Sequence, residues 1–136
     1  MDAFDADVLI YAAVADHQLG EPVLRLFTEA GEDLAGVGSV LLIPELLTKP
    51  LRAGTAEELA VLSALLGRLD LRPVDSATAE LAAALGASYG LRAADAVHLA
   101  TAVAAGADRF LTNNRKDFPR TIVEIEVTYP GDLDNG

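Results

Sequence analysis

Residues 90–114 are predicted to form a helix, a glycine that ends it, a short strand and a polar turn, in that order and without a gap. Small and apolar residues recur there at the spacing of one helix face: Ala93, Val97, Ala100, Thr101 and Ala104. Gly106 stands where the end of a helix favours a residue that tolerates positive φ. Residues 109–111 form a strand short and apolar enough to be buried, and residues 112–114 follow its end. In a parallel α/β sheet that end is where functional sites are built, so we expect a site here.

The rest of the chain alternates strand-like and helical segments in the same way. Buried strands are predicted at residues 37–44 and 69–74, and alternating apolar residues at 123–129 predict a half-exposed edge strand. Residues 3–15 leave two interpretations open: one long strand, or a short strand ending near Asp5 with Asp7 as the N-cap of a helix. The capping chemistry favours the second interpretation. Together these segments predict an α/β sandwich with a mainly parallel central sheet.

Prolines and capping residues mark where the predicted helices begin and end. Pro44 suits a first helical turn, so Glu45 should lie at the start of a helix, which Pro50 should end or kink early. Asp75 or Ser76 caps a later helix. That helix is predicted to bury a face of mostly small residues: Ala77, Leu81, Ala84, Leu85 and Ser88.

Composition limits the class of protein. A chain of 136 residues, 51% of them apolar, can form one domain, predicted to span 1–129 with a flexible acidic tail at 130–136. We expect a cytoplasmic protein without a membrane span, because no long apolar window, signal peptide or cysteine is present. The net charge of −11 repels nucleic acid. Either the partner is cationic, or divalent metals and local basic residues offset the acid.

Three carboxylates share one kind of position. Asp5 and Glu45 follow buried strands, and Asp95 lies in the first turn of an otherwise apolar helix. Thr112 and Asn114 follow another strand, and in a parallel sheet these groups would meet at one edge. Clusters of oxygen ligands of this kind hold Mg²⁺ or Mn²⁺. Such a metal can activate water and neutralise the charge that develops on a phosphodiester.

Each acidic residue also has an ordinary structural interpretation. Asp5 and Asp7 can cap a helix, and Glu45 in a first turn complements the helix dipole. Asp95 is harder to explain in that way, because its surroundings are small and apolar. His98 can face the cluster, but a hydrogen-bonded packing histidine is the favoured interpretation.

Other charged residues are most simply explained as surface or capping groups, although several fall near the proposed edge. The acidic ones are Asp75, Asp108 and Asp117. The basic ones, candidates for contact with an RNA backbone, are Lys49, Arg52, Arg92 and Arg115. It is the co-location of acidic and basic groups that favours a functional site.

Four segments resemble, in order, the motifs of the PIN domain family, which includes ribonuclease toxins of bacterial toxin–antitoxin systems. The first is Phe4-Asp5-Ala6-Asp7-Val8-Leu9-Ile10-Tyr11, and the second is Ile43-Pro44-Glu45-Leu46-Leu47. The third runs from Arg92 through Asp95 to Ala102, and the fourth from Phe110 through Asn114 to Phe118. The resemblance covers nearly the whole chain, and the match at Glu45 is the least specific of the four.

The resemblance implies a three-layer α/β/α fold that cleaves single-stranded RNA with Mg²⁺ or Mn²⁺ held by Asp5, Glu45 and Asp95. Thr112 and Asn114 would orient water or a phosphate oxygen. It also implies a homodimer and a small antitoxin whose tail enters the acidic site. One position departs from the pattern, because many members carry Asp where this chain has Asn114. Asp117 is a possible substitute, although its interpretation as a capping residue is favoured.

Two other classes compete with this hypothesis. Residues 5–9 also fit the nucleophile motif of haloacid-dehalogenase-like phosphatases, but Lys49 and Lys116 lack convincing placement for the lysine those enzymes need. Their late pair of acids would have to come from Asp132 and Asp134, which fall in the tail. The alternative is a catalytically weak or inactive PIN-like module whose acidic pocket binds a basic peptide. The net charge and Asn114 favour that alternative, and three carboxylates in matching places count against it.

Overall fold

Five parallel strands form the central sheet, in the order β3-β2-β1-β4-β5. The structure is a computed structural model that describes residues 1–135. Its strands are β1 (Asp2–Phe4), β2 (Gly36–Ser39), β3 (Leu69–Arg72), β4 (Arg109–Leu111) and β5 (Glu126–Thr128). Because all neighbouring strands pair in parallel, their carboxyl ends lie at one edge of the sheet.

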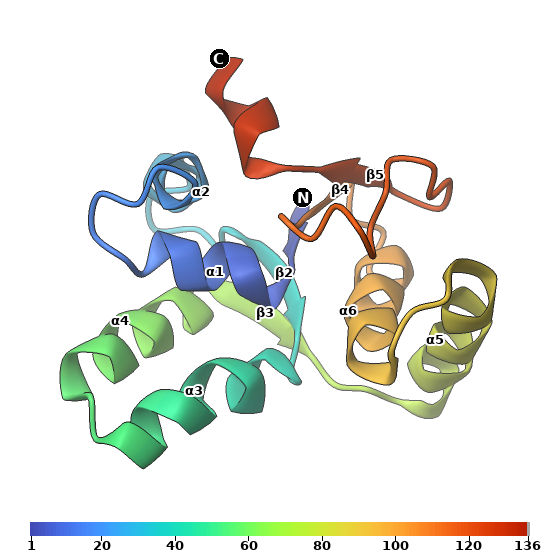
Figure 1. The fold of residues 1–136 in the computed structure, drawn as a ribbon, viewed down its shortest axis with the longest axis horizontal. Coiled ribbons are helices and arrows are strands. Elements are labelled where there is room, and N and C mark those ends of the chain that lie inside the picture. The colour runs from blue at the N-terminus through green and yellow to red at the C-terminus, as the bar shows by residue number, and fades with distance from the viewer. Residues whose placement is uncertain (136) are drawn as a thin grey trace.

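Six α-helices cover the sheet on its two faces (Figure 1). One layer contains α1 (Ala6–Ala12), α2 (Gly20–Glu29), α3 (Leu42–Ala53) and α4 (Ala56–Leu66). The other layer contains α5 (Ser76–Tyr89) and α6 (Ala93–Ala104). Among helices within residues 1–135, none has the length and apolar character needed to cross a membrane.

Alternate strand residues face opposite layers, which produces two separate cores. Ala3 and Phe110 pack with α5 and α6, while their chain neighbours Phe4 and Leu111 pack with α1 to α4. Period-two alternation of this kind, apolar on both faces, is typical of a parallel sheet covered on both sides. The predicted three-layer α/β/α sandwich is therefore confirmed.

The strand predicted at residues 37–44 is confirmed only up to residue 39, and the prediction is wrong for the residues after it. Strand β2 ends at Ser39, whose hydroxyl accepts a hydrogen bond from the Leu41 amide at 3.1 Å, and helix α3 begins at Leu42. Leu42 is fully buried, so the apolar run belongs partly to a buried helix start, which periodicity alone does not distinguish from a strand. Of the two effects predicted for Pro50, an early end of α3 is wrong, since the helix continues to Ala53, and a kink stays a prediction.

The predicted face of α5 is rotated from the one that is buried. Of the five predicted residues Leu85 is buried and Leu81 partly so, while Thr78 and Ala82 are buried in place of the others. In α6 the predicted stripe is only partly right, because Ala100 and Thr101 are buried, Val97 is half-buried, and Ala93 and Ala104 are exposed. The helix lies between the sheet and α5, and these contacts decide which residues are buried. The buried residues of α6 are Ala96, His98, Leu99, Ala100, Thr101 and Ala102.

The ends of the chain differ in detail from the sequence predictions. The short first strand is confirmed, but the N-cap of α1 is Asp5 and not Asp7. Edge strand β5 is shorter than predicted, because Val123 is 84% exposed and only residues 126–128 pair with β4. Two details are confirmed: Asp75 caps α5, and Gly106 follows α6 with a φ of +71°.

Residues after the last strand form a short 3-10 helix, η1 (Pro130–Asn135). Asp132 of this helix accepts hydrogen bonds from the Arg120 guanidinium and from the Tyr129 amide. Residue 136 of the predicted tail lies outside the described residues, and the domain boundary at 129 and the tail's flexibility stay predictions.

Replacing Gly36 of β2 should destabilise the fold. A Cβ atom there would lie 2.2 Å from the Asp2 carbonyl oxygen and 2.8 Å from the Phe4 ring, so the strands must separate. We expect Gly36→Ala to lower the free energy of unfolding by about 2 kcal/mol or more, as overpacking does. Urea denaturation measures this.

Gly67→Ala provides the control, because the nearest atoms to its Cβ would lie at 3.5 Å and its φ is −64°. We expect this control to change the free energy of unfolding by less than about 0.5 kcal/mol. Equal stability of the two variants would contradict the close packing at β2.

Candidate active site

Asp5 is buried at the carboxyl end of β1, where it joins three elements. Its amide donates to the Leu111 carbonyl of β4 at 2.9 Å, which continues the strand pairing by one residue. One carboxylate oxygen accepts from the Ala6 amide at 2.9 Å and so caps α1. The other accepts from the Thr112 hydroxyl at 2.8 Å. Asp5 is therefore fixed by the backbone of β4, by the backbone of α1 and by the Thr112 side chain.

The turn after β4 is held to this carboxylate and to the next one along α1. The Thr112 hydroxyl, fully buried, also accepts from the Asn114 amide at 3.1 Å. The Asn113 amide donates to Asp7 Oδ2 at 3.0 Å. The sequence predicts Thr112 and Asn114 at this edge, and in the structure Thr112 contacts Asp5 while Asn114 contacts Thr112.

Glu45 and Asp95 approach from the two helix layers. Each lies in the first turn of its helix, α3 for Glu45 and α6 for Asp95. Glu45 Oε1 lies 2.5 Å from Nε2 of His98, which is one turn after Asp95 on α6. The favoured interpretation of His98 as a packing residue is therefore only half of its role, since it is buried and also contacts a predicted site residue.

Burial and like charge raise the pKa values of the aspartates in this group. Burial raises the pKa of Asp5, and the neighbouring His98 and the Thr112 hydrogen bond partly oppose that shift. Burial, with the charge of Asp5, raises the pKa of Asp7 to about 7. The pKa of Asp95 is raised first by burial and then by Asp5 and Asp117. These carboxylates therefore lie close enough to repel one another.

A model of the PIN domain family matches residues 3–123, which is most of the chain. The chain belongs to the PIN domain family. No sequence among curated proteins matches it. The resemblance predicted from the four motifs is thus confirmed at the level of the family.

Solved structures with the same fold come from toxin–antitoxin complexes. A chain of a toxin–antitoxin complex from Klebsiella pneumoniae is 25% identical, with a TM-score of 0.75, and the match covers 96% of this chain and 98% of that chain. A chain of VapBC2 from Rickettsia felis, bound to promoter DNA, is 18% identical with a TM-score of 0.72 and coverage of 94% and 97%. A chain of DNA-bound VapBC from Salmonella typhimurium is 19% identical with a TM-score of 0.72 and coverage of 95% and 97%. The last two show the fold alone.

The donor chemistry of this PIN domain fits a hard divalent cation. Every carboxylate in the group offers oxygen, the ligand that Mg²⁺ and Mn²⁺ prefer. Asp7 Oδ1 is buried and has no hydrogen-bond partner among the described residues. Repulsion among neighbouring carboxylates is relieved by a cation. Within residues 1–135, however, no group of three or more Asp, Glu, His or Cys side chains is arranged to hold an ion.

The remaining predicted site residues lie at the border of the PIN domain site. Asn114 pairs with Asp117: its amide group donates to Asp117 Oδ2 at 2.9 Å, and the Asp117 amide donates back at 3.3 Å. The capping residue of this turn is therefore Asn114, whose side-chain oxygen accepts from the backbone, and not Asp117, whose carboxylate accepts only from the Asn114 side chain. The charge of Asp117 also raises the pKa of Asp95. Arg115 is turned away, since its guanidinium stacks 4.2 Å from the centre of the Tyr129 ring.

The other basic candidates are exposed on helices that border the site. Lys49 and Arg52 lie on α3, the helix of Glu45. Arg92 is the N-cap residue of α6, three residues before Asp95. No ion pair joins any of these three to a carboxylate in the part of the chain that the structure describes. The three basic side chains can therefore bind a ligand without breaking an ion pair of the fold.

Sequence reasoning underestimated two members of the site. Asp7 was interpreted as a helix cap, yet its carboxylate holds the turn after β4. Its position two residues after Asp5 was the available signal, because the first turn of α1 begins at the strand end. His98 had a clearer signal, since a spacing of three residues from Asp95 puts both on one helix face.

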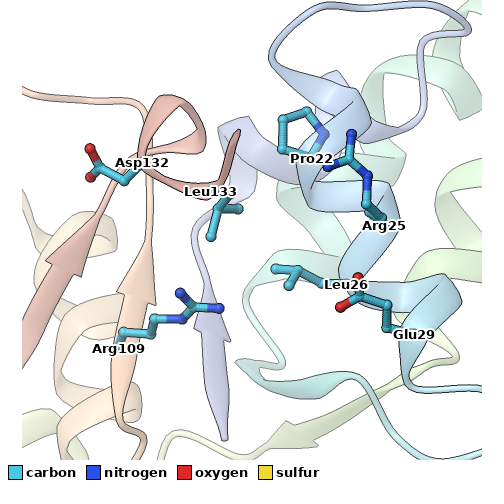
Figure 2. Close-up of a pocket in the computed structure, with 7 residues that line it drawn as sticks. All are labelled: Pro22, Arg25, Leu26, Glu29, Arg109, Asp132 and Leu133. Atoms are coloured by element: carbon cyan, nitrogen blue, oxygen red, sulfur yellow. The ribbon is translucent and has the colours of Figure 1, made fainter. Parts of the chain in front are cut away.

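A pocket of about 410 Å³ lies between α2, η1 and β4 (Figure 2). Its lining residues come from α2, η1 and the start of β4: Pro22, Arg25, Leu26, Glu29, Arg109, Asp132 and Leu133. Arg109 there is already paired with Asp2 at 2.7 Å. None of the residues that line this pocket belongs to the predicted site.

Removing the charge of Asp7 should stabilise the metal-free protein at high pH. Because its pKa is about 7 when folded and near 3.8 when unfolded, the folded state binds more protons between these values. Stability therefore falls as pH rises from 4 to 7. In EDTA, Asp7→Asn should raise the free energy of unfolding by on the order of 2 to 4 kcal/mol at pH 8 and much less at pH 4.

Urea denaturation at both pH values measures this effect. Asp33→Asn removes one charge from an exposed loop and serves as the control. A gain at pH 8 equal to that of the control would contradict the burial of a charged Asp7.

Proposed function

We propose that this PIN domain is a metal-dependent endoribonuclease that cleaves single-stranded RNA and acts as the toxin of a toxin–antitoxin pair. The observation that carries the proposal is the gathering of Asp5, Asp95 and Glu45 at one sheet edge of a PIN domain. Asp5 also caps α1, but the fold does not require Asp95 and Glu45 to place further carboxylates near it. Asp5 is buried, and repulsion between its carboxylate and the neighbouring ones costs stability, so a function that binds a cation explains why they are present.

Asp5, Glu45 and Asp95 would hold Mg²⁺ or Mn²⁺, with Asp7 as a further oxygen donor beside them. When bound, such a metal lowers the pKa of water and neutralises the charge of a phosphodiester. Thr112 holds Asp5 by donating to one of its oxygens, so that its carboxylate cannot rotate. Asn114 is fixed by Asp117 and offers a neutral amide group to orient water or a phosphate oxygen.

Substrate binding must overcome a net charge of −11. Lys49, Arg52 and Arg92 are exposed on the two helices that carry Glu45 and Asp95. Positive side chains in this position would hold the phosphates on either side of the cleaved bond. Arg115 would join them if it leaves Tyr129. The acidic remainder of the surface predicts weak RNA binding without metal.

The proposed partner is a small antitoxin protein. The Klebsiella pneumoniae structure, described as a toxin–antitoxin complex, matches this chain over nearly the full length of both. An antitoxin with basic residues would be attracted to the acidic site. We also propose a homodimer and, from the absence of cysteine, action in the reducing cytoplasm.

A second candidate function is a binding module without catalysis. The observation that favours it is that no three acidic or imidazole side chains among residues 1–135 are arranged to hold an ion. Such a module would use the same carboxylates to capture an arginine-rich or lysine-rich peptide. Metal affinity discriminates between the two candidates.

Asp95→Asn should abolish both metal binding and RNA cleavage. The change removes one charge from the first turn of α6 and keeps a side chain of the same size. We expect Mn²⁺ affinity measured by calorimetry to fall by at least about 10-fold, and cleavage of single-stranded RNA to fall by at least about 100-fold. Asp33→Asn, on an exposed loop, is the matched control and should behave as the wild type.

Three results would contradict parts of this proposal. Wild-type protein that fails to bind Mn²⁺ would favour the binding module. Metal binding without cleavage of any RNA would support the proposed metal site and contradict the proposed nuclease activity. Unchanged cleavage in Asp95→Asn would show that the assignment of Asp95 is wrong.

A further inference from the structure

One side-chain contact joins the two helix layers across the carboxyl edge of the sheet. His98 comes from α6 and Glu45 from α3, and these helices pack on opposite faces of the sheet (Figure 1). The His98 side chain is 1% exposed, whereas that of Glu45 is 33% exposed. A rigid, buried donor therefore holds a longer and partly solvated carboxylate.

Glu45 has no other restraint of this kind among the hydrogen bonds of the described residues. It has three rotatable side-chain bonds, and its side chain is 33% exposed. A glutamate that samples several rotamers must be ordered before it can bind anything, and that ordering reduces affinity. Asp5, in contrast, is held by hydrogen bonds from Ala6 and Thr112. Among the described residues, the Asp5 carboxylate has two such hydrogen bonds, that of Glu45 has one and that of the shorter Asp95 has none, so His98 is the single restraint on Glu45.

The buried nitrogen on the other side of the imidazole indicates which atom donates. His98 Nδ1 is buried and has no hydrogen-bond partner among the described residues. A proton placed on Nδ1 would be buried without an acceptor, whereas a proton on Nε2 has the Glu45 carboxylate as its acceptor. Donation from Nε2 also leaves Glu45 an ionised carboxylate, the form that a cation binds.

We propose that His98 is a positioning residue that fixes the Glu45 carboxylate toward Asp5 and Asp95. This inference rests on the proposed function, because it assumes that Glu45 belongs to a metal site. Its action is indirect: His98 donates one hydrogen bond to Glu45 and does not itself bind the metal or the RNA. The same contact sets the distance between α3 and α6 at the open end of the sheet.

Three substitutions separate the hydrogen bond from packing. His98→Gln places an amide nitrogen near the position of Nε2 and keeps the donor. His98→Asn places its amide near the position of Nδ1, one bond short of Glu45. His98→Leu fills the space and removes both nitrogens. Calorimetric titration with Mn²⁺ reads out the site without any need for catalysis, and circular dichroism checks that each variant is folded.

We expect His98→Leu and His98→Asn to weaken Mn²⁺ binding by roughly 10-fold or more, the usual effect of removing a partner that orients a ligand. His98→Gln should stay within about 3-fold of the wild type, because the donor to Glu45 is retained. Saturating Mn²⁺ should restore RNA cleavage in His98→Asn, since the ligands themselves are intact. If His98→Leu does not fold, the comparison of Gln with Asn still decides the question.

The outcomes distinguish this inference from the function on which it rests. Wild-type affinity in all three variants would overturn the role of His98 while leaving the proposed function in place. Equal losses in Gln and Asn would overturn it in favour of packing, and tighter binding in His98→Leu would show that His98 competes with the metal for Glu45. A wild-type protein without Mn²⁺ affinity, or Asp95→Asn with full affinity, would overturn the proposed function itself.

Discussion

The hydrogen bond from the Thr112 hydroxyl to Asp5 connects the ends of the two central strands, and the rest of the site depends on it. Both groups are buried, and a hydrogen bond to a charged group is worth about 1.5–3 kcal/mol. That contribution offsets part of the cost of burying the Asp5 carboxylate, which its raised pKa reports. Thr112 also accepts from the Asn114 amide, so the same hydroxyl fixes the turn that carries Asn114.

Parallel strand order explains why residues distant in sequence meet at this point. Strands β1 and β4 are neighbours in the sheet although 107 residues separate Asp5 from Thr112. Helices α3 and α6 begin at the same edge, so a carboxylate in the first turn of each is directed to one place. First turns carry the positive end of the helix dipole, which favours acidic side chains there. The architecture thus supplies positions that tolerate several carboxylates.

Sequence reasoning succeeded where local chemistry and fold agree. The strand at 109–111, the glycine after α6 and the polar turn at 112–114 each follow from short-range rules. It failed where tertiary packing decides. The apolar run after Ser39 is a helix because Leu42 packs into the core beneath α1, and the buried face of α5 is set by α6 rather than by residue size. The contact between His98 and Glu45 spans 53 residues, so no local pattern contains it.

Repulsion among the carboxylates of the site lowers the stability of the metal-free fold. This loss is limited because the carboxylates lie on several helices. Asp5 caps α1, Asp7 lies in α1 and Glu45 in α3, whereas Asp95 lies in α6, so a small separation of the two helix layers would relieve the repulsion between Asp95 and the others. His98 opposes such a separation, because its bond to Glu45 connects the layers directly. The His98–Glu45 hydrogen bond therefore keeps the carboxylates close together despite their like charge. A divalent cation stabilises this arrangement.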